Sequence, residues 1–118
     1  VRMKRQRAER SGRDGEAKAA LWLRAKGWQI LDRRVKTSAG EIDLIAKRGS
    51  LVAFIEVKWR QRKEELDHAI DEYRLSRVAA ACEAVAYRYA KEGEDIRIDV
   101  ILLAPGAFPR HIANAWQP

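Results

Sequence analysis

Two apolar runs separated by a glycine–serine pair constrain the fold of this chain more than any other feature of its sequence. The runs are Glu41–Lys47 and Leu51–Trp59, and the loop between them contains Gly49 and Ser50. A two-residue loop with glycine in the first position is typical of a type II′ turn, which joins adjacent antiparallel strands. The sequence therefore predicts a β-hairpin in which Arg48 faces Leu51.

This register brings charged residues together on one side of the hairpin. Counting back from the loop, Asp43 falls opposite Glu56, and Glu41 falls opposite Lys58. Opposed residues share a side of a sheet, as do residues two apart. Asp43, Glu56 and Lys58 are therefore predicted to converge, with Glu41 at the edge. That side also carries Ile45, Val52 and Phe54, and the other side carries Ile42, Leu44, Ile55, Val57 and Trp59.

Two carboxylates that face each other at a partly buried position need a counter-charge, because opposed like charges destabilise a sheet. A divalent cation supplies that charge and prefers oxygen ligands. Asp43 and Glu56 are therefore predicted to bind Mg²⁺ or Mn²⁺, and Lys58 to orient a water or stabilise charge on a phosphate. The alternative is a salt-bridge ladder in which Lys58 pairs with Glu41 and Asp43 while Glu56 is solvated. The apolar neighbours favour the metal site over the ladder.

The remaining pattern predicts an α/β fold with a mixed central β-sheet flanked by helices on both faces. Ser11 or Asp14 is expected to cap a first helix that ends at Gly27. Further elements are expected over Trp28–Val35 (strand), Asp67–Lys91 (helix), Ile96–Leu103 (strand) and His111–Trp116 (edge strand). The periodicity of the long helix turns Ile70, Tyr73, Val78, Ala81, Cys82, Val85 and Tyr89 inward.

Length and charge bound the organisation of the chain. Its 118 residues predict a single domain over residues 11–118, preceded by a disordered basic arm at residues 1–10. The net charge of +7 favours a polyanion partner such as nucleic acid, although many basic proteins bind none. A lone cysteine and the lack of an apolar run of ~20 residues predict a cytoplasmic protein with no membrane partner. A homodimer is left open.

Several other titratable residues do not form a recognisable site. Cys82 lies in an alanine-rich helix with no base nearby, which predicts a core residue. His68 and His111 lack the spacing of metal ligands and are expected to be structural or exposed. Asp99 lies in an apolar strand and could be a buried partner for the neighbourhood of Arg97, but its sequence position does not place it in the predicted site.

The two runs Gly40–Ile45 (GEIDLI) and Phe54–Arg60 (FIEVKWR) together resemble the D…ExK signature of the restriction-endonuclease-like superfamily. The resemblance extends over about Gly15 to Trp116. Within the superfamily the chain is more closely similar to the uncharacterised bacterial YraN-like family, which is itself similar to archaeal Holliday-junction resolvases. The residues that carry this closer match are Gly15, Glu16, Ala19, Ala20, Leu23, Arg97, Asp99, Val100, His111, Ile112, Asn114, Ala115 and Trp116.

The resemblance implies roles for individual residues. It makes Asp43, Glu56 and Lys58 catalytic, with both carboxylates as metal ligands. It also makes Glu16 a metal ligand or water-positioning group, whereas from position alone Glu16 is a first-turn carboxylate that favours the helix dipole. Relatives often carry a lysine near the start of the second long helix. This chain offers arginines there, and four arginines are expected to bind nucleic acid: Arg60, Arg62, Arg74 and Arg77.

The leading interpretation is a metal-dependent nuclease that hydrolyses nucleic-acid phosphodiesters, with branched DNA as a candidate substrate. One alternative is a nucleic-acid-binding module that has the nuclease fold but no turnover. Another is a protein-interaction subunit that uses the basic arm. The acidic pair favours the nuclease, because a module that only binds phosphate gains nothing from two carboxylates. Sequence reasoning leaves DNA versus RNA, and linear versus branched substrates, open.

Overall fold

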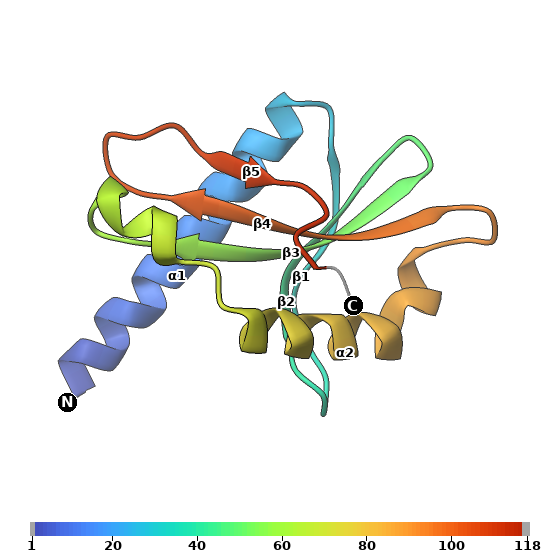
Figure 1. Ribbon diagram of the computed structural model, residues 1–118, viewed down its shortest axis with the longest axis horizontal. Helices are drawn as coiled ribbons and strands as arrows, with labels where there is room; N and C mark the ends of the chain where they lie inside the picture. Colours follow the sequence, from blue (N-terminus) through green and yellow to red (C-terminus); the bar gives the residue numbers. More distant parts are fainter. Residues whose placement is uncertain (1, 117–118) are drawn as a thin grey trace.

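A computed structural model describes residues 2–116 of the chain, with side chains described from Asp14 onward. The elements are α1 (Arg2–Ala25), β1 (Gln29–Lys36), β2 (Glu41–Arg48), β3 (Leu51–Trp59), the 3₁₀ helix η1 (Lys63–His68), α2 (Glu72–Tyr89), β4 (Asp95–Leu103) and β5 (Arg110–Ile112). The strands form one five-stranded sheet in the order β1-β2-β3-β4-β5 (Figure 1). Only β3 and β4 run parallel among these neighbours, so the predicted mixed sheet is confirmed.

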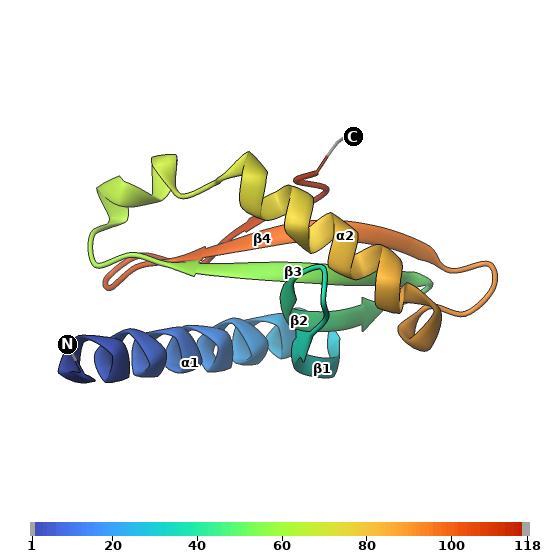
Figure 2. The ribbon, with the colours of Figure 1, turned by 90° about the horizontal axis from the view of Figure 1, so that it is seen from below.

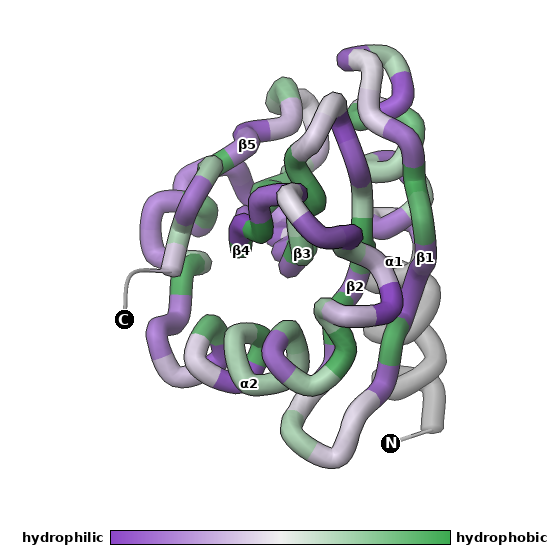
Figure 3. Tube along the Cα trace, turned by 90° about the vertical axis from the view of Figure 1, so that its right-hand side faces the viewer, coloured by the Kyte–Doolittle hydropathy of each residue, from purple (hydrophilic) through white to green (hydrophobic). Residues whose placement is uncertain are grey.

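The two α-helices cover opposite faces of the sheet, as predicted (Figure 2). α1 packs through Ala19, Ala20 and Leu23, which are fully buried. The two alanines are small and let the helix approach β3. α2 packs through Val78, Ala81, Cys82 and Val85, which recur every three or four residues and so form one helical face. The strands lie between the two helices, and their hydrophobic stretches form the middle layer (Figure 3).

The hairpin register predicted from the sequence is confirmed next to the turn. Arg48 pairs with Leu51, and the ladder continues in step as far as Leu44 and Ile55. Gly49 has φ +62°, whereas Ser50 is not among the residues with positive φ. A positive φ at the first central position alone is the signature of a type II′ turn.

The predicted helix over Asp67–Lys91 is wrong at its start, because two separate helices occupy that region. Asp71 has an extended backbone, and its carboxylate accepts hydrogen bonds from the backbone N–H groups of Tyr73 and Arg74, which begins α2. Leu66 and Ala69 are buried in a cluster with Val100 and Leu102 of β4, which Leu75 of α2 also joins, so η1 packs against β4 beside the start of α2. Ile70 and Tyr73, predicted inward, are 42% and 70% exposed.

Differences at the ends of elements are smaller. α1 begins at Arg2, so neither Ser11 nor Asp14 is its N-cap; it ends before Gly27, which has φ +90°. The segment predicted as a disordered arm falls within this helix assignment, and its side chains lie outside the described ones, so the division into arm and domain stays a prediction. The last strand is short, at Arg110–Ile112. Within residues 2–116, none of the helices combines the length and apolar character that crossing a bilayer requires.

Candidate active site

β2 separates from β3 where the sequence predicted two opposed carboxylates. The ladder ends at the pair Leu44–Ile55, so Asp43 and Glu56 are not ladder partners, and that part of the register prediction is wrong. Instead, Oδ2 of Asp43 accepts a hydrogen bond of 2.8 Å from the backbone N–H of Val57. The Asp43 side chain therefore satisfies an N–H of β3 that the departing strand leaves without a ladder partner.

The salt-bridge ladder considered as the alternative does not form. Glu41 pairs in the sheet with Lys36 of β1 and not with Lys58. Nζ of Lys58 lies 3.2 Å from Oε1 of Glu56, and neither Glu41 nor Asp43 forms an ion pair with it in the described residues. Glu56 is only 4% exposed and Lys58 only 8%, so this is a buried pair and not a solvated carboxylate.

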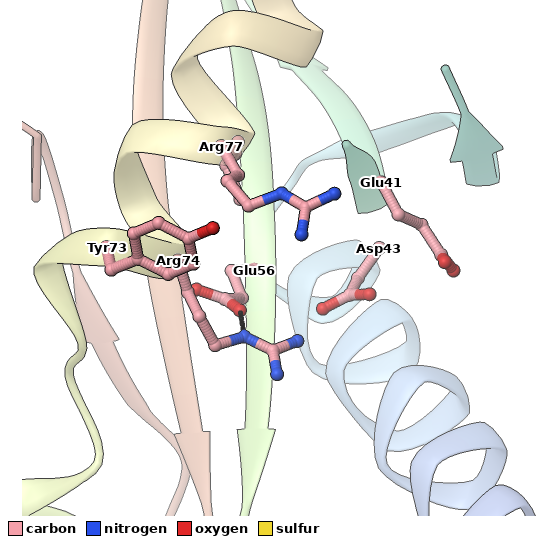
Figure 4. Close-up of a pocket in the computed structure, with 7 residues that line it drawn as sticks. Glu41, Asp43, Glu56, Tyr73, Arg74 and Arg77 are labelled. Carbon is pink, nitrogen blue, oxygen red and sulfur yellow. Dashed lines mark hydrogen bonds and ion pairs between the residues drawn. The ribbon is translucent and has the colours of Figure 1, made fainter. Parts of the chain in front are cut away.

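The first turns of α2 complete a pocket over the two carboxylates. The pocket has a volume of about 400 Å³ and is lined by Glu41, Asp43, Glu56, Tyr73, Arg74, Arg77 and Val78. Nε of Arg74 lies 3.0 Å from Oε1 of Glu56, the same oxygen that Lys58 contacts. Figure 4 shows the guanidinium of Arg77 pointing across the pocket toward the side on which Asp43 lies. The pocket thus has an acidic wall from β2 and β3 and a basic wall from α2.

A glycine sets the spacing between these walls. A Cβ atom at Gly40 would lie 2.7 Å from the backbone oxygen of Arg77, a distance that real Cβ atoms essentially never show. The turn before β2 is held by Thr37, whose Oγ1 donates to the oxygen of Gly40 at 2.8 Å and accepts from its nitrogen at 3.0 Å. Only glycine lets this turn sit against α2, which brings Asp43 close to the arginines.

Burial raises the pKa of the Asp43 carboxyl to about 6. The hydrogen bond from Val57 acts in the opposite direction and lowers it. Three carboxylates raise it further by their charge: Glu16, Glu56 and Glu41. Asp43 therefore lies in an environment with too little positive charge for its ionised form, although two arginines line the same pocket.

Glu16 lies near the site but does not line the pocket. Its Oε2 is 2.7 Å from Nε of Arg34, and this hydrogen bond, with the charges of Glu16, Glu41 and Asp43, raises the pKa of the Arg34 guanidinium. Arg34 has φ +52°, a left-handed conformation that is uncommon for a residue with a side chain. Such strain clusters at functional sites. Glu16 thus joins the acidic cluster from α1, with Arg34 as its counter-ion.

The four arginines predicted to bind nucleic acid divide into two pairs. Arg74 and Arg77 line the pocket. Arg60 and Arg62 do not: they follow the end of β3, and Nη1 of Arg60 donates to the backbone oxygen of Trp59 at 2.9 Å. The structure therefore brings only the α2 pair to the carboxylates.

Sequence reasoning missed three contributors to the site. Tyr73 was assigned to the core but lines the pocket. Taking Asp71 as the helix cap would have placed Tyr73 in the first turn of the helix, on the same face as Arg77 four residues later. Gly40 stood in the GEIDLI run, yet nothing in the run shows its contact with α2. No signal in the single sequence marks the backbone of Arg34.

The pocket offers carboxylate oxygens to a divalent cation but contains no complete metal site within the described residues. Among the described residues, no group of three or more His, Cys, Asp or Glu side chains has metal-binding geometry. However, Oδ1 of Asp43 and Oε2 of Glu56 accept no hydrogen bond from the described part of the chain. Two carboxylate oxygens suit Mg²⁺, which keeps several waters and takes further ligands from substrate phosphates. The donor set therefore fits a cation that is completed by substrate.

A fully buried aspartate, Asp99, lies in β4, next to the edge strand β5. Asp99 is 0% exposed, and its carboxylate is surrounded by hydrogen-bond donors: two from Arg97 at 2.7 and 2.8 Å, Nε2 of His111 at 2.7 Å and the backbone N–H of Asn114 at 2.9 Å. Burial alone would raise the pKa of Asp99, but these hydrogen bonds lower it to about 2. His111 is accordingly structural, as expected, and Asp99 anchors β5 and the segment that follows it.

Comparison with known proteins places the chain among close relatives. Residues 15–103 match the family described as "Uncharacterised protein family UPF0102". A UPF0102 protein of Erythrobacter litoralis is 80% identical over 116 residues, which cover 98% of this chain and all of the relative. A UPF0102 protein of Sphingopyxis alaskensis is 57% identical over the same shares of both chains. One of Rhodopseudomonas palustris is 43% identical over 93% of this chain and 85% of the relative.

Proposed function

Since this chain belongs to the uncharacterised protein family UPF0102, whose description names no activity, we propose a function from the site itself: metal-dependent hydrolysis of nucleic-acid phosphodiesters. One observation carries the proposal. Two carboxylates from separate strands and two arginines from one helix line a single pocket, and Lys58 contacts one of the carboxylates. The acidic wall suits a cation, and the basic wall suits a phosphate.

Different residues would perform different steps of phosphodiester hydrolysis. Asp43 and Glu56 would hold Mg²⁺ or Mn²⁺, which supplies a Lewis acid and favours ionisation of water. Lys58 follows Glu56 by two residues, about 6.6–6.8 Å of strand, and its ammonium would orient the attacking water or stabilise charge on the phosphate. Arg74 and Arg77 would bind phosphate oxygens, for which the planar guanidinium has matching geometry.

Two further features support this assignment. The order Asp43, Glu56, Lys58 resembles the D…ExK pattern of restriction-endonuclease-like enzymes, and the mixed sheet with helices on both faces is compatible with such a fold. DNA enters the proposal through this likeness, and branched DNA through the likeness to resolvases. The net charge of +7 suits a polyanion partner.

The test is a cleavage assay with purified wild-type protein and Mg²⁺ or Mn²⁺. Linear, flapped and four-way DNA are compared with matched RNA, and products are resolved on denaturing gels. Wild type is expected to cut at least one substrate, and Asp43→Asn to cut none. Asp95→Asn is the matched control: it removes one exposed carboxylate at the start of β4, outside the pocket, and should leave the rate unchanged.

The outcome also separates the nuclease from the nucleic-acid-binding module. Tight binding of nucleic acid without cleavage under either metal would favour a binding module that lacks turnover. Cleavage that Asp43→Asn leaves intact would contradict the assignment of the site and indicate a contaminating nuclease. If wild type neither binds nor cuts any substrate, the proposed function fails.

A further inference from the structure

Tyr73 is an exposed aromatic ring inside a pocket whose other walls are charged. Its side chain is 70% exposed, although it lies beside Arg74 and one helical turn before Arg77. Its backbone, in contrast, is fixed: the nitrogen donates to Asp71 at 2.9 Å, and the oxygen accepts from Ser76 at 2.6 Å. Figure 4 shows the ring on the α2 side of the pocket, next to both arginines. A firmly held backbone thus presents apolar ring surface where a ligand phosphate would bind.

At the start of α2, the backbone donors nearest the two arginines are already used. The carboxylate of Asp71 already accepts from the N–H groups of Tyr73 and Arg74. Contacts to a phosphate therefore come from side chains, and the nearest are the guanidinium groups of Arg74 and Arg77. A nucleotide whose phosphate binds these arginines has its sugar and base beside them, where Tyr73 supplies the only aromatic ring among the described residues that line the pocket.

We propose that Tyr73 stacks on a nucleobase adjacent to the bound phosphate, and that the site therefore takes nucleotides that are not paired within a continuous duplex. This inference rests on the proposed function, and it specifies the substrate class. Inside a duplex both faces of a base are covered by neighbouring bases, so an aromatic side chain reaches a base face only where the base is unpaired or displaced. Stacking of this kind tolerates any base, because every base has a π-face.

The pocket geometry agrees with a splayed nucleotide. Glu56 and Lys58 are 4% and 8% exposed, so the reacting phosphate has to enter between β3 and α2 to reach them. Single-stranded ends, flaps and branch points supply a backbone that can enter in this way. The Arg74–Glu56 pair lines the entry, and Tyr73 lies on the helix that forms one side of it.

The test measures binding and not cleavage, so it is independent of turnover. Fluorescence anisotropy is recorded without divalent metal, using a short labelled single-stranded DNA and its blunt duplex. Tyr73→Ala should weaken binding of the single strand about 5- to 150-fold and change binding of the duplex less than about twofold. Tyr73→Phe keeps the ring and should bind like wild type. Tyr87→Ala is the matched control, because Tyr87 is 75% exposed on the same helix but lies outside the pocket.

Each result decides between readings. Selective loss with Tyr73→Ala, restored by phenylalanine, supports stacking. Equal loss on both DNAs would overturn it and indicate damage to the arginine wall, and no loss on either would overturn it as well. Circular dichroism shows whether the variants are folded. If wild type binds neither DNA, the proposed function has failed, which differs from a wild type that binds both and ignores Tyr73.

Discussion

Asp43 and Asp99 both lie in strands of the sheet, yet their surroundings shift their pKa values in opposite directions. Four hydrogen bonds from three residues reach the Asp99 carboxylate and hold its pKa at about 2. Asp43 receives one, from Val57, and its pKa is raised to about 6 by burial and by neighbouring carboxylates. A buried carboxylate that accepts hydrogen bonds at both oxygens stabilises the fold. A carboxylate with few donors around it lowers stability unless a ligand binds it.

The contrast extends to the cations around each carboxylate. Arg97 is held by both oxygens of Asp99 in a bidentate pair, which leaves it little freedom to serve a ligand. In the other region Arg74 and Lys58 meet on a single oxygen of Glu56, and Arg77 forms no ion pair with a described residue. The pocket therefore still has charged groups on both walls that can bind a ligand, whereas Arg97 and Asp99 are already bound to each other.

The largest expected effect is on turnover. Lys58→Met keeps much of the side-chain volume and removes the ammonium, so the cleavage rate per folded molecule should fall about 100- to 10,000-fold. Arg97→Met removes a cation from the Asp99 anchor instead and should lower stability but not the rate per folded molecule. Single-turnover kinetics with folded fractions from circular dichroism give both numbers. Equal rates for wild type and Lys58→Met would show that Lys58 only neutralises Glu56.

The next effect is on stability at the anchor. Asp99→Ala leaves Arg97 and His111 without their buried partner, and removing one member of a buried pair costs about 3–5 kcal/mol. Urea unfolding at neutral pH measures the loss. Acid should produce a smaller loss in wild type, at most about 2.5 kcal/mol, which is the size of the pKa shift. Because the pKa of Asp99 is depressed in the folded state, its stabilisation is present above about pH 4 and is lost as the pH falls through about 2. An Asp99→Ala protein as stable as wild type would mean that the hydrogen bonds merely offset the cost of burial.

At Asp43 the sign reverses. Its folded pKa of about 6 exceeds the ordinary value of 3.8, so the folded state keeps a proton that the unfolded chain loses between these pH values. Stability should therefore fall as the pH rises through this window. Asp43→Asn removes that cost and should stabilise the metal-free protein at pH 7 by at most about 3 kcal/mol, with no gain near pH 4. Thermal unfolding at both pH values checks it.

Bound metal should remove the stability difference between Asp43→Asn and wild type. Added Mn²⁺ is expected to raise the unfolding temperature of wild type at pH 7 and to leave Asp43→Asn nearly unchanged, because a ligand stabilises only the state that binds it. A stabilisation of both proteins by the same amount would argue for metal binding elsewhere. An Asp43→Asn variant that is less stable than wild type at pH 7 without metal would contradict the cost assigned to the charge of Asp43.

The hairpin and the placement of its two carboxylates on one side could be predicted from the sequence. Period-two alternation and the Gly49–Ser50 loop predicted the hairpin, and the register brought Asp43 and Glu56 to one side of it. Both residues line one pocket in the structure, although the strands have parted and the two are not ladder partners. Local pattern sufficed there because turn geometry propagates along a hairpin residue by residue.

Other parts depend on contacts between distant segments, which periodicity does not encode. Beyond Leu44, β2 stays paired with β1 but not with β3, and the turn at Gly40 rests on α2. The role of Asp99 depends on His111 and Asn114, which follow it by 12 and 15 residues. The break before α2 was signalled by Asp71, but the apolar periodicity around it favoured one continuous helix.

The smallest predicted effect separates the arginines of the two regions. Each phosphate contact contributes about 0.7 to the slope of log affinity against log salt on single-stranded DNA. Arg77→Gln should therefore make the slope for a single strand shallower by about 0.7, because Arg77 lines the pocket and its guanidinium forms no ion pair with a described residue. Arg97→Gln removes the same charge from a side chain bound to Asp99, so its slope should match wild type. Anisotropy titrations over a range of KCl concentrations, without divalent metal, resolve slopes of this size. Equal changes in both variants would mean that net charge alone governs binding; a change for Arg97 only would place the DNA on the β5 side of the sheet.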